Sequence, residues 1–263
     1  MAARHTPPIA LLTDFGADNW YVASLKGVIT GICPAASLLD ISHAIPPYDV
    51  MTGAFTLAAA APWFPPRTIF VCVVDPGVGS DRAIVAAEAD GQVFIGPDNG
   101  VLSVVLARAS RVSMVRVAAV RYRLPSVSRT FHGRDIMAPA AAHVANGVPL
   151  RSLGAPVTRY RHLAMPSVTR TARGLRGSIV LIDHFGNLIT NLPSEKLRPL
   201  EQWEVLYRQK RLRVVSSYER GRSGELVALP GSVGYVELAM RQASAAARLK
   251  AARGEAVEMR RVA

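Results

Sequence analysis

Two side chains that could do chemistry lie seven residues apart in the segment VVDPGVGSDRAI, residues 73–84. Asp75 follows a short apolar run, and Arg82 comes after a Pro–Gly turn. A carboxylate can accept a proton, and a neighbouring guanidinium favours its ionised form. The pair therefore suggests proton-transfer chemistry, although the segment could also be a turn whose solvated rim is formed by Asp81 and Arg82.

Two more acids, Asp14 in LLTDFG and Asp98 in IGPDNG, also follow apolar runs. In an open parallel sheet the ligand crevice lies beyond the carboxyl ends of the strands. Each acid alone is better explained as a helix cap or an Asx turn. Together with Asp75, however, they favour a cluster that would suit ribose hydroxyls, a cationic ligand or proton transfer.

A further ionisable group stands near the start of TFHGRDIMAPAAA, residues 130–142. His132 and Gly133 precede an alanine-rich stretch that predicts a helix. Taken alone, His132 is more readily explained as a helix cap or a core histidine than as a catalytic group. Its role depends on the side chains that the fold brings beside it.

The segments that must position these groups alternate between strand and helix signals. Short apolar runs predict buried strands at residues 9–15, 37–42 and 68–75. Helix-length segments at residues 21–33 and 49–64 separate them. This alternation predicts a mainly parallel sheet with crossover helices.

A hairpin is expected next, because Asp90 and Gly91 can supply the positive φ of a tight turn between residues 83–89 and 92–96. Later helices are predicted over residues 100–109 and 134–147.

The pattern changes after about residue 150, where Pro, Arg and Thr break it and short strands with Gly turns follow. These strands are predicted at residues 177–183, 212–218, 225–231 and 234–240. The sequence therefore predicts an α/β domain over residues 1–160, a linker over 161–175 and a smaller, mostly β, barrel-like domain over 176–263.

Composition narrows the class of protein. Half of the 263 residues are apolar, which is enough for a buried core. The apolar runs are interrupted before membrane-spanning length and residues 1–8 lack the apolar stretch of a signal peptide, so we expect a cytoplasmic protein. Cys33 and Cys72 are expected to be packed thiols. The histidines show no metal-binding spacing, which favours metal-independent chemistry.

The net charge of +12 raises nucleic acid as a partner. Nearly all of the excess lies in residues 151–263 and most of it is arginine, but no aromatic-interleaved basic motif appears. Nucleic-acid binding is therefore not favoured. The kinase-like strings TDFG and HGRD lack a preceding glycine-rich loop and strand lysine, and their order along the chain excludes a kinase.

Taken in order, seven motifs identify a family. They are LLTDFGADNWYVASLKGVI, DISHAIPPYDVMTGAFTL, VVDPGVGSDR, GPDNGVLS, TFHGRDIMAP, IDHFGNLITNL and SVGYVELA. The series covers nearly the whole chain and resembles the adenosine-forming S-adenosylmethionine hydrolases, or S-adenosylmethionine hydroxide adenosyltransferases, which are related to fluorinases and chlorinases. The resemblance implies that S-adenosylmethionine (SAM) is hydrolysed to adenosine and L-methionine, with inversion at the ribose 5′ carbon and with no cofactor.

The resemblance also implies a triad of Asp75, Arg82 and His132 that handles the attacking water. In the halogenases the aspartate position is tyrosine and the histidine position differs, so Asp75 and His132 favour hydroxide over halide. Gly133 stands where fluorinases have a halide-binding serine and chlorinases a glycine, so this position alone leaves chloride open.

Substrate-binding roles are carried over in the same way. Asp14 matches the acceptor for the ribose hydroxyls, and Tyr48 matches an aromatic residue that lies against the nucleoside. Asn19 stands where the family usually has aspartate near the methionine, and Val233 stands where a second serine is commoner. The other residues that the resemblance places at the substrate are Phe131 and Gly133, with Phe185 and Asn187 at the adenine, Asp183 at the ammonium and Ser232 at the carboxylate of methionine.

Relatives form trimers in which each site lies between the first domain of one subunit and the second domain of its neighbour, so the resemblance implies a homotrimer. Two alternatives to the hydrolase remain open. One is a SAM-dependent, chlorinase-like halogenase, and the other is a basic protein that binds nucleic acid or nucleosides without catalysis.

Overall fold

The structure is a computed structural model that describes residues 6–262, so His5 and the start of the first predicted domain lie outside the described part. The chain divides into two compact units, residues 1–163 and 164–263. This division falls within the segment predicted as a linker. Part of that segment, β7 (Thr169–Arg170), pairs with a strand of the second unit.

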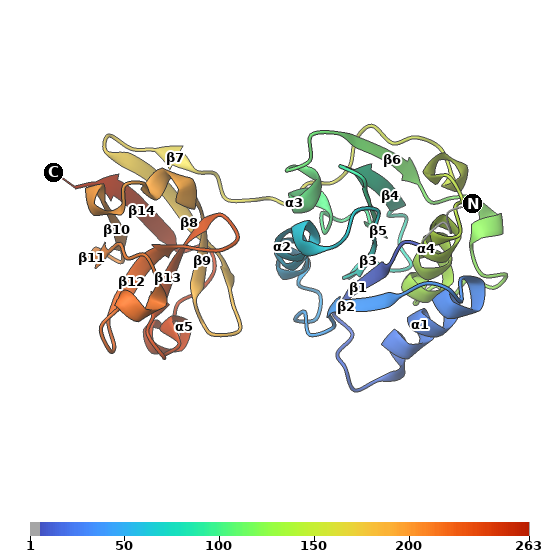
Figure 1. Cartoon of the computed structure of the whole chain (residues 1–263), viewed down its shortest axis with the longest axis horizontal. Coiled ribbons are helices and arrows are strands. Elements are labelled where there is room, and N and C mark those ends of the chain that lie inside the picture. Colours follow the sequence, from blue (N-terminus) through green and yellow to red (C-terminus); the bar gives the residue numbers. More distant parts are fainter. Residues whose placement is uncertain (1–5, 263) are drawn as a thin grey trace. The chain divides into compact units, whose positions relative to one another are not determined.

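The first unit has the predicted alternation of strands and helices (Figure 1). Its elements are β1 (Ile9–Thr13), α1 (Trp20–Ile32), β2 (Leu38–Ser42), α2 (Val50–Ala60), β3 (Ile69–Val73), β4 (Ile84–Ala89), β5 (Gln92–Pro97), α3 (Ser103–Leu106), β6 (Val112–Arg116) and α4 (Ala138–Ala145). Single 3₁₀ turns occur at Ala61–Trp63, Val120–Tyr122 and Leu150–Leu153.

These strands form one sheet in the order β2-β1-β3-β5-β4-β6. Strands β2, β1, β3 and β5 pair in parallel, whereas β4 pairs antiparallel with both β5 and β6. The predicted mainly parallel sheet is therefore confirmed. Because β1 and β3 are neighbours, the loops after their carboxyl ends lie side by side, and these loops carry Asp14 and Asp75.

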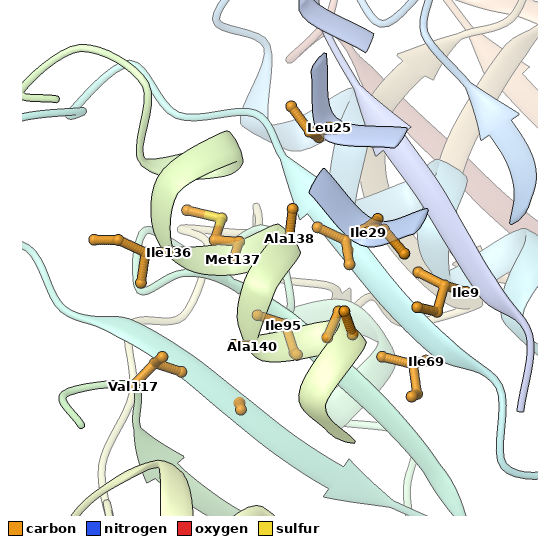
Figure 2. Packing of buried hydrophobic residues seen from close by; sticks show 14 of the residues in the cluster. Ile9, Leu25, Ile29, Ile69, Ile95, Val117, Ile136, Met137, Ala138 and Ala140 are labelled. Carbon is orange, nitrogen blue, oxygen red and sulfur yellow. The ribbon is translucent and has the colours of Figure 1, made fainter. Parts of the chain in front are cut away.

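Helices cover both faces of the sheet, because alternate residues of β1 are apolar and pack in a core on each face. Ile9 and Leu11 belong to a core that includes Leu25 and Ile29 of α1 and the alanines of α4 (Figure 2). Ala10 and Leu12 belong to a second core with residues of α2 and α3. Every side chain of β1 is thus buried, as expected for a strand in a sheet with helices on both faces.

The hairpin between β4 and β5 is also confirmed. Asp90 and Gly91 adopt positive φ values of 46° and 83°. Both values suit the tight turn that joins a twisted strand pair. The small Asp–Gly turn therefore directs the antiparallel return of β5 next to β3.

The helix predicted over residues 134–147 begins with a π-helical turn at Gly133–Met137 before α4. Pro139 lacks an N–H and cannot donate to the carbonyl of Asp135. That carbonyl instead accepts a hydrogen bond from the backbone N–H of Leu124, at 2.9 Å. The proline thus widens the first turn of the helix directly after His132.

The second unit is mostly β, as predicted. Its elements are β7, β8 (Gly174–Ile182), β9 (Leu188–Pro193), β10 (Trp203–Tyr207), β11 (Lys210–Arg213), β12 (Leu226–Pro230), β13 (Tyr235–Met240), α5 (Ala245–Leu249) and β14 (Ala256–Arg261). Single 3₁₀ turns occur at Ser194–Leu197, Leu200–Gln202 and Tyr218–Arg220.

These strands follow the antiparallel order β11-β10-β14-β8-β9-β13-β12. A bridge between Val214 and Ala228 joins the two ends of this order, so the sheet nearly closes on itself. Tyr207, Leu238 and Met259 belong to the enclosed core. The barrel-like prediction is confirmed.

Cys33 and Cys72 are both buried free thiols, as predicted. Burial raises the pKa of Cys72 far above its ordinary value. Within residues 6–262, no helix has both the length and the apolar character needed to span a membrane.

Candidate active site

A cleft of about 380 Å³ lies in the first unit, beyond the ends of β1 and β3. Six of the predicted site residues line it: Asp14, Tyr48, Asp75, Phe131, His132 and Gly133. The position agrees with the expected crevice at the carboxyl edge of a parallel sheet.

Asp75, Arg82 and His132 form one connected group at this cleft. The Nε of Arg82 donates to Oδ1 of Asp75 at 2.6 Å, and its Nη2 donates to Oδ2 of the same carboxylate. Nη2 also lies 3.0 Å from Nδ1 of His132. The side chains of Arg82 and Asp75 are only 7% and 6% exposed, so this ion pair is shielded from water and fixed in a two-point geometry.

The contact with Arg82 determines the tautomer of His132. A guanidinium can only donate hydrogen bonds, so Nδ1 must accept and the proton of the neutral ring lies on Nε2. Burial lowers the pKa of His132, and the positive charge of Arg82 lowers it further. His132 is therefore a neutral ring that offers an N–H donor.

Tight packing joins the two loops that carry the triad. Gly79 has a φ of +82°, and a Cβ at this position would lie 2.5 Å from the carbonyl oxygen of Arg129. A Cβ on Gly133 would lie 2.9 Å from a methyl carbon of Val73. The glycines thus allow the loop of Asp75 and the loop of His132 to approach each other.

Asp14 and Tyr48 form a second feature of the cleft. The backbone N–H of Tyr48 donates to Oδ2 of Asp14 at 2.8 Å, and Tyr48 has a φ of 67°. Left-handed backbone is uncommon for a residue with a large side chain and is often found at functional sites. The ring of Tyr48 is 74% exposed. Burial raises the pKa of Asp14.

Asp98 and Asn19, both expected near this cleft, do not line it. Oδ1 of Asp98 accepts the backbone N–H of Arg161 at 2.7 Å, so this acid stabilises a loop instead of joining the predicted cluster. Asn19 caps α1, where its side-chain oxygen accepts from the N–H of Tyr21 and its amide donates to the carbonyl of Phe15. A contact between Asn19 and the substrate stays a prediction.

Aromatic residues beside Asp14 also line the cleft, and the sequence reasoning missed them. Phe15 and Tyr21 pack edge-on against the buried ring of Phe131, with ring centroids 5.7 and 5.2 Å apart. Their signal in the sequence was the density of aromatic residues in TDFGADNWY. They give the cleft an apolar wall suited to a nucleoside.

A separate cavity of about 720 Å³ lies in the second unit. Asp183, Phe185, Asn187 and Ser232, all predicted to bind substrate, line it. Oδ1 of Asp183 accepts the backbone N–H groups of Phe185 and Asn187, and its Oδ2 accepts from Nδ2 of Asn187. These bonds hold the loop so that the 74% exposed ring of Phe185 lies at the cavity.

The structure adds Tyr218, Glu237 and Gln242 to this cavity. The sequence offered little signal for them, because Glu237 occupies a regular position in a β-strand pattern. Across residues 6–262, no group of three or more His, Cys, Asp or Glu side chains is arranged to hold a metal ion. Catalysis without a metal stays a prediction.

Comparison with known protein families identifies the family of both units. Residues 9–154 match the model of the SAM hydroxide adenosyltransferase N-terminal domain, and residues 177–258 match that of the C-terminal domain. The chain belongs to the SAM hydroxide adenosyltransferase family.

Two hydrolases are similar to this chain over nearly the full length of both proteins. An (R)-S-adenosyl-L-methionine hydrolase from Salinispora tropica is 37% identical over 92% of this chain and 93% of its own. Another, from Thermus thermophilus, is 36% identical over 90% of this chain and 93% of its own. A crystal structure of a Thermotoga maritima protein has a TM-score of 0.89 at 33% identity, covering 96% of this chain and all of the other. Fluorinases match at 28–30% identity.

Proposed function

We propose that this protein hydrolyses S-adenosyl-L-methionine to adenosine and L-methionine. The observation that carries the proposal is the shielded Asp75–Arg82–His132 group on a cleft that also contains Asp14 and Tyr48. The relatives from Salinispora and Thermus are named (R)-S-adenosyl-L-methionine hydrolases. We therefore assign the (R) epimer as the preferred substrate.

The chemistry requires an activated nucleophile more than an acid. Sulfonium sulfur leaves as the neutral thioether of methionine, so it needs no protonation. Water oxygen forms the new bond to the 5′ carbon while the electrons of the carbon–sulfur bond move to sulfur, and the proton of the water goes to a base. Attack opposite to the leaving sulfur gives inversion.

Each member of the triad has a distinct role in this reaction. Asp75 lines the cleft and accepts the proton of the water. His132 donates from Nε2 and orients the water oxygen, since its Nδ1 is occupied by Arg82. Arg82 holds the other two side chains in place, and alignment of the water with the carbon–sulfur bond supplies a large part of the rate.

Binding is assigned to residues of both units. Asp14 accepts the ribose hydroxyls and Tyr48 packs on the nucleoside, while Phe131 and Gly133 complete that wall of the cleft. In the second unit Phe185 and Asn187 contact adenine, and Ser232 binds the carboxylate of methionine. The resemblance supports a homotrimer with each site between the first unit of one subunit and the second unit of its neighbour. A cytoplasmic location of the protein is part of the same proposal.

Chromatography of the products tests the proposal. Purified protein is incubated with (R)-SAM and with (S)-SAM, in chloride buffer and in chloride-free buffer, and adenosine is separated from 5′-chloroadenosine. Adenosine and methionine in equal amounts, formed faster from (R)-SAM, are expected. Formation of 5′-chloroadenosine as the main product would favour the halogenase. Salt-sensitive duplex binding without turnover would favour the nucleic-acid-binding alternative.

A further inference from the structure

Arg134 and Asp135 form a second ion pair shortly after His132. The Nε of Arg134 donates to Oδ1 of Asp135 at 2.6 Å, and its Nη2 donates to Oδ2 at 3.1 Å. The side chain of Asp135 is 0% exposed, whereas that of Arg134 is 32% exposed. A fully buried carboxylate is costly unless it is paired and hydrogen-bonded. The protein therefore keeps a buried charge close to the triad that the proposed mechanism does not use.

Asp135 closes the loop that leads to His132. Its Oδ2 also accepts the backbone N–H of Ser128 at 2.8 Å. Its own backbone adds two bonds, because its carbonyl accepts from the N–H of Leu124 and its N–H donates to the carbonyl of Phe131. Asp135 thus ties the loop that precedes His132 to the π-helical turn that follows it.

This loop contains two further contacts that shape the cleft. The carbonyl oxygen of Arg129 lies so close to Gly79, on the loop of Asp75, that a Cβ at Gly79 would be 2.5 Å from it. The hydroxyl of Ser128 accepts the N–H of Thr130 at 3.0 Å, and Thr130 lines the cleft. The bonds within the loop therefore determine where its cleft-lining residues lie relative to the loop of Asp75.

Arg134 contacts an aromatic residue of the cleft. Its guanidinium carbon lies 4.9 Å from the ring centroid of Phe131. The buried ring of Phe131 lines the cleft and packs edge-on against Phe15 and Tyr21. A cation over an aromatic face is attracted by the ring quadrupole. Because two bonds from Asp135 fix the guanidinium, they also stabilise the position of the Phe131 ring.

The charge of Asp135 also acts on the ring of His132. Burial is the main cause of the lowered pKa of His132, and Arg82 and Arg123 lower it further. Asp75 and Asp135 raise it, and these four are the charged groups that act on the ring within residues 6–262. Asp75 is already paired with Arg82 inside the triad. Loss of the charge on Asp135 should therefore lower the pKa of His132 while leaving the triad chemically intact.

We propose that Asp135 is a positioning residue for the reaction. Clamped by Arg134, its buried carboxylate holds Phe131 and His132 in place at the cleft. Asp135 does not line the cleft, so it acts through these two side chains and touches no reacting atom. The proposal rests on the proposed function for the reaction that His132 serves.

A matched set of variants tests this role. Asp135→Asn removes the charge, Arg134→Met keeps an unbranched stem without the donors, and Arg134→Lys keeps the positive charge. Asp90→Asn is the control, because Asp90 also accepts the backbone N–H groups of a loop, those of Ser110 and Arg111, away from the cleft.

Three measurements are made on each variant. Calorimetry with S-adenosylhomocysteine, whose thioether cannot leave as a neutral sulfide, gives the affinity and counts the folded sites. Steady-state kinetics with SAM then give kcat per folded site and the pH profile of kcat/KM. NMR of the histidine rings follows the titration of His132, whose signal is the one missing in His132→Gln.

Misalignment should lower kcat per folded site by about ten- to hundred-fold in Asp135→Asn and Arg134→Met. Arg134→Lys should keep more of kcat than Arg134→Met. The affinity for S-adenosylhomocysteine should change by less than about five-fold, since most of the assigned substrate contacts lie elsewhere. In Asp135→Asn the titration of His132 and the acid limb of kcat/KM should both move to lower pH. Asp90→Asn should match wild type in all of these.

An unchanged kcat per folded site in Asp135→Asn would overturn the proposal. A lowered kcat with an unmoved titration of His132 would overturn it as well, because Asp135 would then be a structural residue only. If Asp135→Asn did not fold, the Arg134 variants would decide, and equal kcat values in Arg134→Met and Arg134→Lys would contradict the clamp. The titration of His132 needs no turnover, so failure to form adenosine from SAM would contradict the proposed function alone.

Discussion

At the scale of single residues, the site depends on Arg82, which contacts both other members of the triad. It fixes the orientation of Asp75 through two bonds and the tautomer of His132 through a third. The resemblance of motifs could indicate these three residues from the sequence. It could not indicate the tautomer, because that depends on a contact between side chains 50 positions apart. It also missed Glu237, whose burial among apolar strands has no local signal.

The first prediction concerns the two groups that handle the water. Asp75→Asn and His132→Gln should lower kcat by about two to four orders of magnitude, while the affinity for S-adenosylhomocysteine remains within a few-fold. Asp81→Asn, on the exposed part of the same loop, is the control and should be near wild type. Near-normal turnover in either triad variant would mean that the residue has no catalytic role.

The second prediction concerns pH. Because the pKa of His132 lies below its ordinary value of 6.5, the ring stays neutral at and above that pH, and activity should be retained there. Activity should fall as the pH drops through the lowered pKa, since a protonated ring cannot accept from Arg82. The acid limb of kcat/KM should change in His132→Gln but not in His143→Gln, whose pKa is also lowered by burial away from the cleft. If the acid limb of kcat/KM were identical in wild type and His132→Gln, titration of His132 would not control activity.

At the scale of elements, Asp75 and Arg82 of the proposed triad lie on the loop between β3 and β4, and His132 lies directly before the π-helical turn. Short apolar runs let the sequence predict β1, β2 and β3, and the Asp90–Gly91 turn indicated the β4–β5 hairpin. Strands β6, β9, β10 and β14 were missed, and in β10 and β14 charged residues interrupt the short apolar pattern. The widened turn before α4 was missed as well, since it depends on where the carbonyl of Asp135 finds a donor in the folded chain.

The third prediction compares two glycines with positive φ in the first unit. Gly79→Ala should lower kcat by at least ten-fold and should also lower the free energy of unfolding. The added Cβ would meet the carbonyl of Arg129 and push apart the loops of Asp75 and His132. Gly91→Ala, in the hairpin turn, has open space and should cost only about 1 kcal/mol of unfolding free energy. Denaturant unfolding and steady-state kinetics measure both. Equal effects on kcat would contradict a positioning role for the loop contact.

At the scale of the whole molecule, the predicted contacts with the substrate are divided between the two units. The triad and Asp14 belong to the first, and the cavity with Asn187 and Glu237 belongs to the second. The composition of the sequence indicated this change of architecture. It carried no information on which subunits combine, because that depends on complementary surfaces of separate chains.

The fourth prediction tests the proposed arrangement of subunits. Asp75→Asn disables the first unit and Asn187→Ala weakens the second, so each variant alone should be nearly inactive. Co-assembly of the two should restore activity to about a quarter of the sites, since random mixing brings together intact halves from neighbouring chains. If each site lay within one chain, every chain would keep one defect and mixing would restore nothing.

The central claim is that a water held by Asp75 and His132 attacks the 5′ carbon. The most direct test is a single turnover of (R)-SAM in oxygen-18 water, with mass spectrometry of both products. One heavy oxygen at the 5′ position of adenosine and none in methionine are predicted. Unlabelled adenosine in that first turnover would contradict the claim, because it would mean that a carboxylate oxygen of the protein, such as that of Asp75, had attacked carbon and been carried into the product.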